Sequence, residues 1–369
     1  MKAFLASLVA TAAQAYYYDK YENLLALNQR YSNGFSEIEI TVDGKKQTKY
    51  LAADFMAGGG GQMTVPANHR GYLHNTPNMD KENPDYFKPN LLGGAVEWDM
   101  DMSDHECGCI ASFYLVSMPG KDEAGKNWMT TDGFGYCDAN RVDGNLCPEF
   151  DLMEANKYSW ATTPHSCEAP NTGGFYYGCD ANGHAAQNIY NILPWNGYGA
   201  GQDYIINTEL PFHVRIDFET DTNNDFSAFK VQFTQNGAEQ TMISESDYLH
   251  HMGQNLSDGM AFVLSQWGGD ASWLWYDRCS GECNYPELSI NNIKITSGKG
   301  KPADPTEHID PKKYEFGDIC ESSIDDYCGL MHCPGLAHCR WSWPKGDDMT
   351  WSSKHAACRC DVWDTVTYH

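Results

Sequence analysis

Basic residues are scarce in this sequence of 369 residues, where 25 Lys and Arg stand against 50 Asp and Glu, a formal net charge of −25. A chain this acidic repels phosphate backbones and gains nothing from an anionic membrane surface, so neither nucleic acid nor a membrane is an expected partner. The sequence also lacks any apolar run near the roughly 20 residues that a transmembrane helix needs. A neutral or cationic substrate fits this charge better.

Charged residues are few, at 20%, while hydrophobic residues make up 41% of the chain. That balance is enough to bury a substantial core and argues against wholesale disorder. Aromatic residues are plentiful, with 11 Trp and 22 Tyr. Aromatic faces can hold sugars, although many aromatic side chains only fill cores.

The first 15 residues have the pattern of a secretory signal peptide. Lys2 supplies the positive charge, residues 3–10 form a short apolar run, and Ala13-Gln14-Ala15 has the small-x-small pattern of a cleavage site. We therefore expect a secreted, extracellular protein.

The cysteines agree with export, because an oxidising compartment pairs them. They fall into two even sets, which suggests two separately stapled units, although spacing alone does not give the pairing. Zinc binding at Cys107-x-Cys109 or Cys358-x-Cys360 is the alternative, and it is less expected in a secreted chain. The eight cysteines of the body are Cys107, Cys109, Cys137, Cys147, Cys167, Cys179, Cys279 and Cys283, and the six of the tail are Cys320, Cys328, Cys333, Cys339, Cys358 and Cys360.

The body of the chain is expected to be all-β. Apolar and polar residues alternate over 212–218 and again over 229–233, and Asn236-Gly237 then signals a hairpin. A short helix is expected only at 244–255. Together these features predict a large antiparallel β-sandwich at 16–297, a Gly- and Pro-containing linker at 298–317, and a small disulfide-rich module at 318–369.

The clearest chemical signal is the run Glu149-Phe150-Asp151-Leu152-Met153-Glu154. Glu149 and Asp151 share one face of a regular strand, and a single bulged residue would bring Glu154 to that face as well. Two glutamates placed in this way can cleave a glycosidic bond, with retention when their carboxyl groups are about 5–5.5 Å apart and with inversion at wider separations. Asp151 lies between them, where it could hydrogen-bond Glu149 and tune it. A polar strand face without catalytic function is the alternative.

At this strand the chain resembles glycoside hydrolase family 7, cellulases that cut β-1,4-glucan with retention. Residues 149–156 match its E-x-D-x-W-E strand and the A-N that follows, although Met153 replaces the tryptophan. Thr163-Pro164-His165-Ser166-Cys167 matches its T-P-H-x-C run, and Tyr136-Cys137-Asp138-Ala139 its Y-C-D-A turn. Further matches place the likeness at about 70–296, and they include Leu91-Leu92-Gly93, residues 98–101 and 113–118, Met252-Gly253, Gly259-Met260, Leu264-Ser265-Gln266-Trp267 and Trp275-Tyr276-Asp277.

The resemblance implies a concanavalin-like β-jelly-roll with a substrate cleft, and a role for each matched residue. Glu149 would be the nucleophile, Glu154 the general acid/base and Asp151 the partner of Glu149. The implied substrate-binding residues are Tyr114 near the nucleophile, His165 beside the acid/base, the sugar platforms Trp267 and Trp275, and, as weaker transfers, Asp138 and Arg70. No metal or other cofactor is implied, and we expect a monomer whose partner is a polysaccharide.

The chain departs from the family pattern in its loops. Residues 16–63 contain no cysteine and no clear match, and only nine residues, 140–148, join the Y-C-D-A turn to the carboxylate strand. Shorter loops favour an open cleft, and therefore mid-chain cutting rather than processive cellobiose release. Trp273 and Trp275 are expected to share a strand face, as sugar platforms or as core residues.

Two other functions stay open at this point. A β-1,3-glucanase of glycoside hydrolase family 16 has a nearly identical carboxylate strand, but the Y-C-D-A and T-P-H-x-C runs argue against it. A lectin-like sandwich would bind glycans without cutting them and has no use for two glutamates. In the tail, Trp341, Trp343, Trp351 and Trp363 could bind polysaccharide or could form the core of the small module.

Overall fold

The computed structural model describes residues 34–53, 57–59, 61–78, 80, 83–130, 134–269, 272–275 and 279–301, and two strands at 337–342 and 357–362. The chain divides into two compact units, Met1–Pro302 and Ala303–His369. The predicted signal peptide, most of the predicted linker and the tail tryptophans other than Trp341 lie outside the described residues. Within those residues, no helix is long and apolar enough to cross a membrane.

Strands dominate the first unit, and helices are short. Its helical segments are α2 (Ile189–Ile192), the 3₁₀ helix η1 (Asp247–Leu249), α3 (His250–Asp258) and α4 (Ser272–Trp275). Its strands are β1 (Gly34–Val42), β2 (Lys45–Ala53), β3 (Ala57–Gly59), β4 (Gln62–Val65), β5 (His69–His74), β6 (Ala95–Met100), β7 (Cys109–Val116), β8 (Glu149–Ala155), β9 (Trp160–His165), β10 (Gln187–Asn188), β11 (Tyr198–Gly199), β12 (Ile206–Asn207), β13 (Phe212–Thr220), β14 (Phe226–Gln235), β15 (Ala238–Glu245), β16 (Ala261–Gly268) and β17 (Leu288–Thr296). In the second unit, β18 (Ala337–Ser342) pairs with β19 (Ala357–Val362) in antiparallel fashion.

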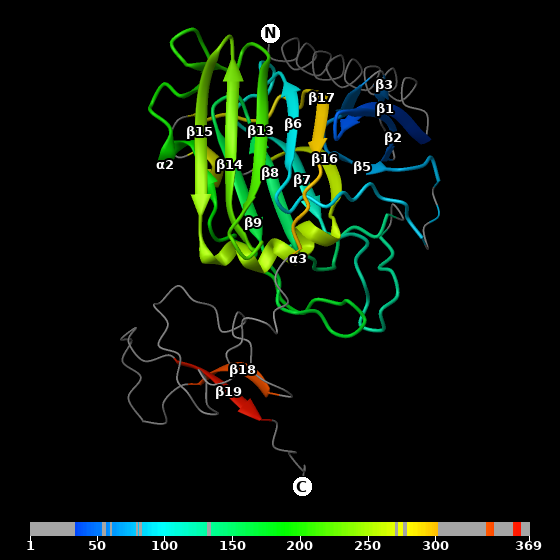
Figure 1. Ribbon diagram of the computed structural model, residues 1–369. Coiled ribbons are helices and arrows are strands. Elements are labelled where there is room, and N and C mark those ends of the chain that lie inside the picture. Colours follow the sequence, from blue (N-terminus) through cyan, green and yellow to red (C-terminus); the bar gives the residue numbers. More distant parts are fainter. Residues whose placement is uncertain are drawn as a thin grey trace, which may run out of the picture. The chain divides into compact units, whose positions relative to one another are not determined.

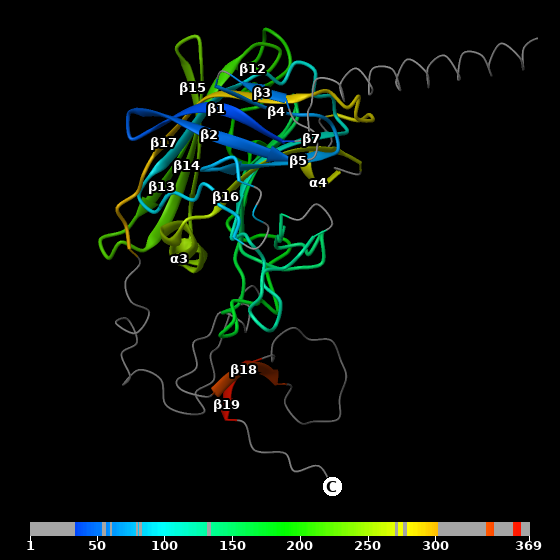
Figure 2. The same ribbon diagram turned by 90° about the vertical axis from the view of Figure 1, so that its right-hand side faces the viewer.

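One large sheet winds through the first unit in the order β10-β9-β8-β7-β16-β5-β2-β1-β17-β6-β13-β14-β15. Its pairs are antiparallel except for β1 with β17. The sheet folds over on itself, so that β6, β13, β14 and β15 lie in front of β7, β8 and β9 (Figure 1), and Figure 2 shows the two layers from the side. The predicted all-β sandwich is confirmed.

Aromatic side chains fill the space between the two layers. Phe150 on β8 lies 5.4 Å from Phe229 on β14, and Trp160 on β9 lies 4.9 Å from Phe233, measured between ring centroids. Trp98 on β6 packs against Trp160 and is completely buried. At roughly 25 cal/mol per Å² of apolar surface, this burial is the main force holding the layers together. The outer layer therefore gives β8 a rigid backing.

The predicted β-hairpin at Asn236-Gly237 joins β14 to β15. Both turn residues have positive φ, 51° and 83°, as a two-residue hairpin turn requires. The helix expected at 244–255 begins later, because β15 continues to Glu245 with Ser244 buried in the sheet. Ser246 then caps η1 by accepting a hydrogen bond from the backbone of Tyr248, and α3 runs on to Asp258.

The first residues of the predicted linker pack on the sandwich. The backbone N–H of Gly298 donates to Asn90 O at 2.8 Å, and that of Gly300 donates to Leu92 O at 3.0 Å. A Cβ atom at residue 298 would meet Leu92 O at 2.0 Å, so glycine permits this close approach. Gly298 and Gly300, which were assigned to the linker, therefore lie against the backbone of residues 90–92.

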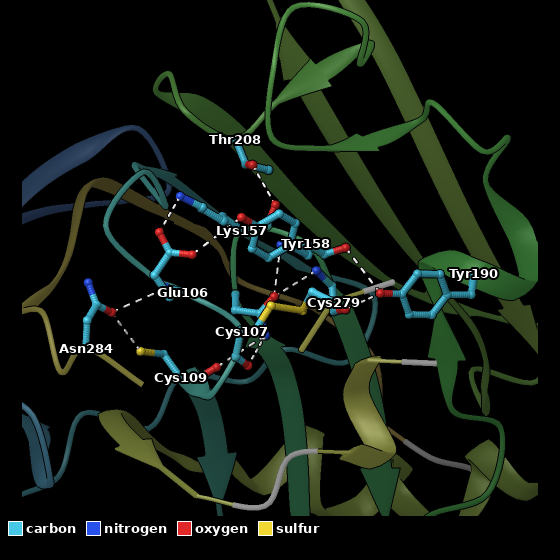
Figure 3. Close-up of a disulfide and its surroundings, with 11 residues drawn as sticks. Glu106, Cys107, Cys109, Lys157, Tyr158, Tyr190, Thr208, Cys279 and Asn284 are labelled. Atoms are coloured by element: carbon cyan, nitrogen blue, oxygen red, sulfur yellow. Dashed lines mark hydrogen bonds and ion pairs between the residues drawn. A yellow bond between two sulfur atoms is a disulfide. The ribbon is translucent and has the colours of Figure 1, made fainter. Parts of the chain in front are cut away.

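All eight cysteines of the body form disulfides with one another: Cys107–Cys279, Cys109–Cys283, Cys137–Cys147 and Cys167–Cys179. The even set predicted for the body is confirmed, and the zinc alternative at Cys107-x-Cys109 is excluded. Figure 3 shows the Cys107–Cys279 disulfide close to the ion pair between Lys157 and Glu106, whose nitrogen and oxygen are 2.6 Å apart. The disulfides of Cys107 and Cys109 join the start of β7 to the segment that follows α4.

Candidate active site

The three acids of β8 reach one surface because the strand is bulged. On β7, Phe113 pairs with Met153 and Tyr114 with Asp151, which leaves Leu152 without a partner on that strand. The Thr162 hydroxyl of β9 donates to Leu152 O at 2.9 Å and holds the bulge. Glu149, Asp151 and Glu154 consequently line the same cleft, of about 1130 Å³, as the sequence predicts.

The floor of the cleft is a continuous row of residues that crosses six strands. Each is the register partner of the next, and each lines the cleft; from β10 to β5 they are Asn188, Ala161, Glu154, Ser112, Ser265 and Arg70. Five steps of about 4.8 Å make this row about 24 Å long. Its side chains are small next to Glu154, so the floor leaves room for an extended, linear ligand.

Aromatic residues border the floor on both sides. On one side Trp267 of β16 and Trp273 of α4 line the cleft, and Trp273 is 46% exposed. On the other side Tyr136 and Phe134 line it, and Phe134 packs on Tyr72 of β5 with ring centroids 4.6 Å apart. The cleft is therefore a groove with aromatic walls and a polar floor.

Burial raises the pKa of each carboxyl group in β8, but the surroundings of the two glutamates differ. Besides burial, the charges of Asp151 and Asp138 raise the pKa of Glu149, while the charge of His165 and the backbone N–H of Ala139, which donates to Glu149 Oε2 at 3.0 Å, lower it. Burial and then the charge of Asp151 raise the pKa of Glu154, which only His165 opposes. The two glutamates thus differ in their contacts, because the Ala139 N–H holds the carboxylate of Glu149.

Asp151 forms an ion pair with His165 of β9, with His165 Nε2 lying 3.1 Å from Asp151 Oδ2. On the other side of the ring, Nδ1 lies 2.7 Å from the carbonyl oxygen of Asp180. A carbonyl oxygen only accepts, so His165 Nδ1 carries a proton. A hydrogen bond between His165 Nε2 and Asp151 Oδ2 needs a second proton, on one of these two atoms. Asp151 also lies close enough to Glu149 for its charge to raise the pKa of that glutamate, and the hydrogen bond expected between the two stays a prediction.

The remaining residues expected in the site also line the cleft. The Tyr114 hydroxyl lies 3.1 Å from the Tyr136 hydroxyl, and both rings are buried beside Glu149. Arg70 lies over the Tyr136 ring, 3.6 Å from its centroid, and pairs with Asp143 at 2.7 Å. Asp138 accepts hydrogen bonds from two backbone N–H groups, and burial raises its pKa.

The two predicted tryptophan platforms have different outcomes. Trp267 lines the cleft as expected. Trp275 is the last residue of α4, and its side chain lies outside the described residues. The expectation that Trp273 and Trp275 share a strand face is wrong, because the chain turns into the short helix α4 after β16. Trp273 nevertheless reaches the cleft.

Sequence reasoning missed several lining residues. Ser112 lies two residues before Tyr114 on β7, so the strand period of two could have placed it on the same face. Tyr136 belongs to the Y-C-D-A turn, but no role was predicted for it. Asn188 and Asn191 lie near α2 and carry no recognisable motif. Among the described residues, no group of three or more His, Cys, Asp or Glu side chains is arranged to hold a metal ion.

His74 lies behind the aromatic wall and is expected to make the fold sensitive to acid. Its ring is 1% exposed, neither nitrogen has a hydrogen-bond partner, and Tyr86 and Phe134 pack around it. Burial lowers the pKa of His74 to about 4 from 6.5. The unfolded chain then binds more protons, so this residue lowers the free energy of unfolding as the pH falls from about 6.5 to about 4.

His74→Phe should reduce that dependence by removing the titrating group from the cluster. Urea unfolding at pH 5 and pH 7 measures it: the difference in unfolding free energy between the two pH values should shrink by about 1–2 kcal/mol. His213→Phe, which changes a half-exposed histidine paired with Asp99 at 2.6 Å, serves as the control. An unchanged difference in His74→Phe would contradict the assignment.

Comparison with known proteins finds that this chain is similar to a glycosyl hydrolase family and to proteins named endoglucanases. A family model described as "Glycosyl hydrolase family 7" matches residues 140–245, which include β8, β9, β13 and β14. Endoglucanase EG-1 of Trichoderma longibrachiatum is 28% identical over 292 residues, covering 69% of this chain and 59% of EG-1. Endoglucanase 1 of Humicola insolens is 25% identical, covering 58% and 66%. The chain thus spans less than two thirds of the length of these relatives.

Solved structures share the fold. An endoglucanase I complexed with cellobiose superposes with a TM-score of 0.57 at 18% identity, covering 73% of this chain and 98% of that one. A family 7 cellobiohydrolase from Daphnia pulex gives a TM-score of 0.53, also at 18% identity, with coverage of 73% and 98%. The jelly-roll fold and the resemblance inferred from the carboxylate strand are both confirmed.

Proposed function

We propose that this chain, a relative of glycoside hydrolase family 7, is a secreted, retaining glycosidase that cleaves β-1,4-glucosidic bonds in cellulose or a related β-glucan. The observation that carries the proposal is the bulge at Leu152, which brings Glu149 and Glu154 into one cleft from a single strand. A protein that only binds glycans has no need of two buried glutamates in different protonation environments. The four disulfides of the body support secretion.

The mechanism assigns one step to each glutamate. Glu149, whose carboxylate accepts the Ala139 N–H, attacks the anomeric carbon and forms a glycosyl-enzyme ester, while Glu154 gives its proton to the departing oxygen. The ionised Glu154 then takes a proton from water, and the resulting hydroxide releases the sugar from Glu149. The configuration at the anomeric carbon is inverted twice and so retained. Proton NMR of the first product, recorded before mutarotation, tests the retention.

The cleft suits a neutral, linear polysaccharide. Its floor is a row of about 24 Å, and Trp267 and Trp273 offer aromatic faces along one side. Four carboxyl groups line it against the single guanidinium of Arg70, which is already paired with Asp143. This charge disfavours chains of uronic acids. The relatives of known activity are named endoglucanases, in agreement with a β-1,4-glucan as substrate.

Endo action is the favoured mode of attack. Trp273 on one lip of the cleft is 46% exposed and Val142 on the other is 63% exposed, so these lips stay open to solvent. An open groove can take up a chain at an internal position. Carboxymethyl-cellulose should therefore lose viscosity well before reducing ends accumulate in proportion. A rise in reducing ends without early loss of viscosity would indicate attack from chain ends.

A panel of polysaccharides tests the substrate class. Release of reducing sugar is expected from carboxymethyl-cellulose and, more slowly, from crystalline cellulose. Laminarin, a β-1,3-glucan, should be a poor substrate. Preference for laminarin would favour the family 16 type of activity, and binding of all three polymers without cleavage would favour a lectin-like function.

Asp151→Asn is expected to move the whole pH profile of kcat/KM to lower pH. The charge of Asp151 raises the pKa of both Glu149 and Glu154. Without that charge, Glu149 ionises at lower pH, which extends the acidic limb. Glu154 also loses its proton at lower pH, so the fall of kcat/KM on the alkaline side begins at a lower pH.

The control is Asp99→Asn, which removes a carboxylate paired with His213 outside this cleft. Its profile should stay in place. An Asp151→Asn profile that keeps both limbs at their wild-type pH would contradict the electrostatic role of Asp151.

A further inference from the structure

The hydroxyl group of Ser112 is an unexplained polar group on the cleft floor. Ser112 lines the cleft and is 3% exposed, and its Oγ has no hydrogen-bond partner in the structure. A buried hydroxyl without a partner costs folding free energy and is uncommon in native proteins. At the same position alanine would avoid that cost, so the hydroxyl is expected to find a partner in another state of the protein.

The neighbours of Ser112 on the floor make no hydrogen bond to its hydroxyl, which is therefore available to a ligand in the cleft. The register partners of Ser112 are Glu154 on β8 and Ser265 on β16, both on the floor row. Two positions away on β7, Ile110 makes apolar contacts with Ala161 and Leu274. On the other side, the Tyr114 hydroxyl is hydrogen-bonded to Tyr136. The residue next to Glu154 on the floor row therefore carries a buried hydroxyl without a partner, which can both donate and accept.

A glycan lying along the floor row would place one sugar directly over β7. If the bond to be cut lies over β8, between Glu149 and Glu154, the adjacent sugar on the Arg70 side covers Ser112, one strand spacing of about 4.8 Å away. We propose that the Ser112 hydroxyl binds a free hydroxyl of this sugar and thereby selects glycans that are unsubstituted at that position. This inference rests on the proposed function, because it uses the same cleft and the same orientation of the chain.

Calorimetric titration with cellotetraose tests the proposal in protein made inactive by Glu149→Gln. Adding Ser112→Ala should raise Kd about 3- to 10-fold, the effect of losing one hydrogen bond between neutral groups. The melting temperature should stay the same or rise, because the variant removes an unpartnered buried hydroxyl. The control is Thr208→Val, in which a buried hydroxyl that donates to Lys157 O at 2.7 Å is lost outside the cleft. It should leave Kd unchanged and lower the melting temperature.

Monodeoxy cellotetraoses identify the sugar hydroxyl. The monodeoxy sugar that lacks the hydroxyl bound by Ser112 should bind the Ser112→Ala protein and its Ser112 parent equally tightly. Without that sugar hydroxyl, the Ser112 hydroxyl has nothing to bond. The inference is overturned if Ser112→Ala leaves the Kd for cellotetraose unchanged. It is also overturned if this variant lowers the melting temperature as much as Thr208→Val does, since the hydroxyl would then have a partner in the protein.

Hydrolysis of cellotetraose by the wild-type chain, measured alongside, separates the two proposals. Hydrolysis together with an unchanged Kd in Ser112→Ala overturns the inference alone. Binding that depends on Ser112 without any hydrolysis supports the inference and overturns the proposed glycosidase. Absence of both binding and hydrolysis overturns both.

Discussion

Replacing Glu149 with glutamine is expected to reduce hydrolysis of cello-oligosaccharides by at least about 10³-fold while leaving their binding nearly intact. The amide has almost the shape of the carboxylate, so the groove and the hydrogen bond from the Ala139 N–H change little. It has no charge with which to attack the anomeric carbon. Reducing-sugar release measures the loss, and calorimetric titration with cellotetraose measures the binding.

A chemical rescue distinguishes a lost nucleophile from a distorted fold. Glu149→Ala leaves space for a small external anion, so azide should restore turnover of an aryl β-cellobioside and yield a glycosyl azide of inverted configuration. Glu106→Gln provides a control, because Glu106 pairs with Lys157 outside the cleft. Substantial activity of Glu149→Gln without azide would refute the assignment of the nucleophile.

Glu154→Gln should show losses that depend on the leaving group. A sugar alcohol needs a proton as it departs, so cello-oligosaccharide hydrolysis should fall by about 10²–10⁴-fold. An acidic phenol leaves without that help, so the first step on a dinitrophenyl β-cellobioside should survive. The second step still lacks its general base, and the glycosyl-enzyme should accumulate. The expected signature is a burst of phenol equal to the enzyme concentration, followed by slow turnover.

The burst can be recorded by stopped-flow absorbance and the ester on Glu149 by intact-protein mass spectrometry. Azide should speed up the second phase, because it needs no general base. Equal losses on the oligosaccharide and on the dinitrophenyl glycoside would show that Glu154 does not donate a proton to the leaving group.

The bulge on β8 could be predicted because it follows from local geometry. Side chains alternate along a strand, so two acids at i and i+2 share a face and a third at i+5 does not unless one residue is absorbed. The structure absorbs Leu152 in this way. The β13–β14–β15 meander was predictable for the same reason, since its alternation and its Asn236-Gly237 turn are local signals.

Contacts between distant segments could not be predicted. Asp151 and His165 are 14 positions apart and meet because β8 and β9 are neighbours, which neither segment reveals alone. The partner of Cys107 is 172 residues away, and spacing carries no information on such a pair. The expectation that Trp273 and Trp275 share a strand face was wrong for a different reason. Their two-residue spacing was interpreted as part of a strand, whereas the chain forms the short helix α4 there.

The loop between Cys137 and Cys147 makes the position of Glu149 depend on a disulfide. Its disulfide joins two cysteines that are ten positions apart, and between them lies Ala139, whose N–H donates to the Glu149 carboxylate. Oxidation of this one cysteine pair therefore helps to assemble the centre itself. A chain in which Cys137 and Cys147 are still reduced would keep both glutamates but hold the carboxylate of Glu149 less firmly.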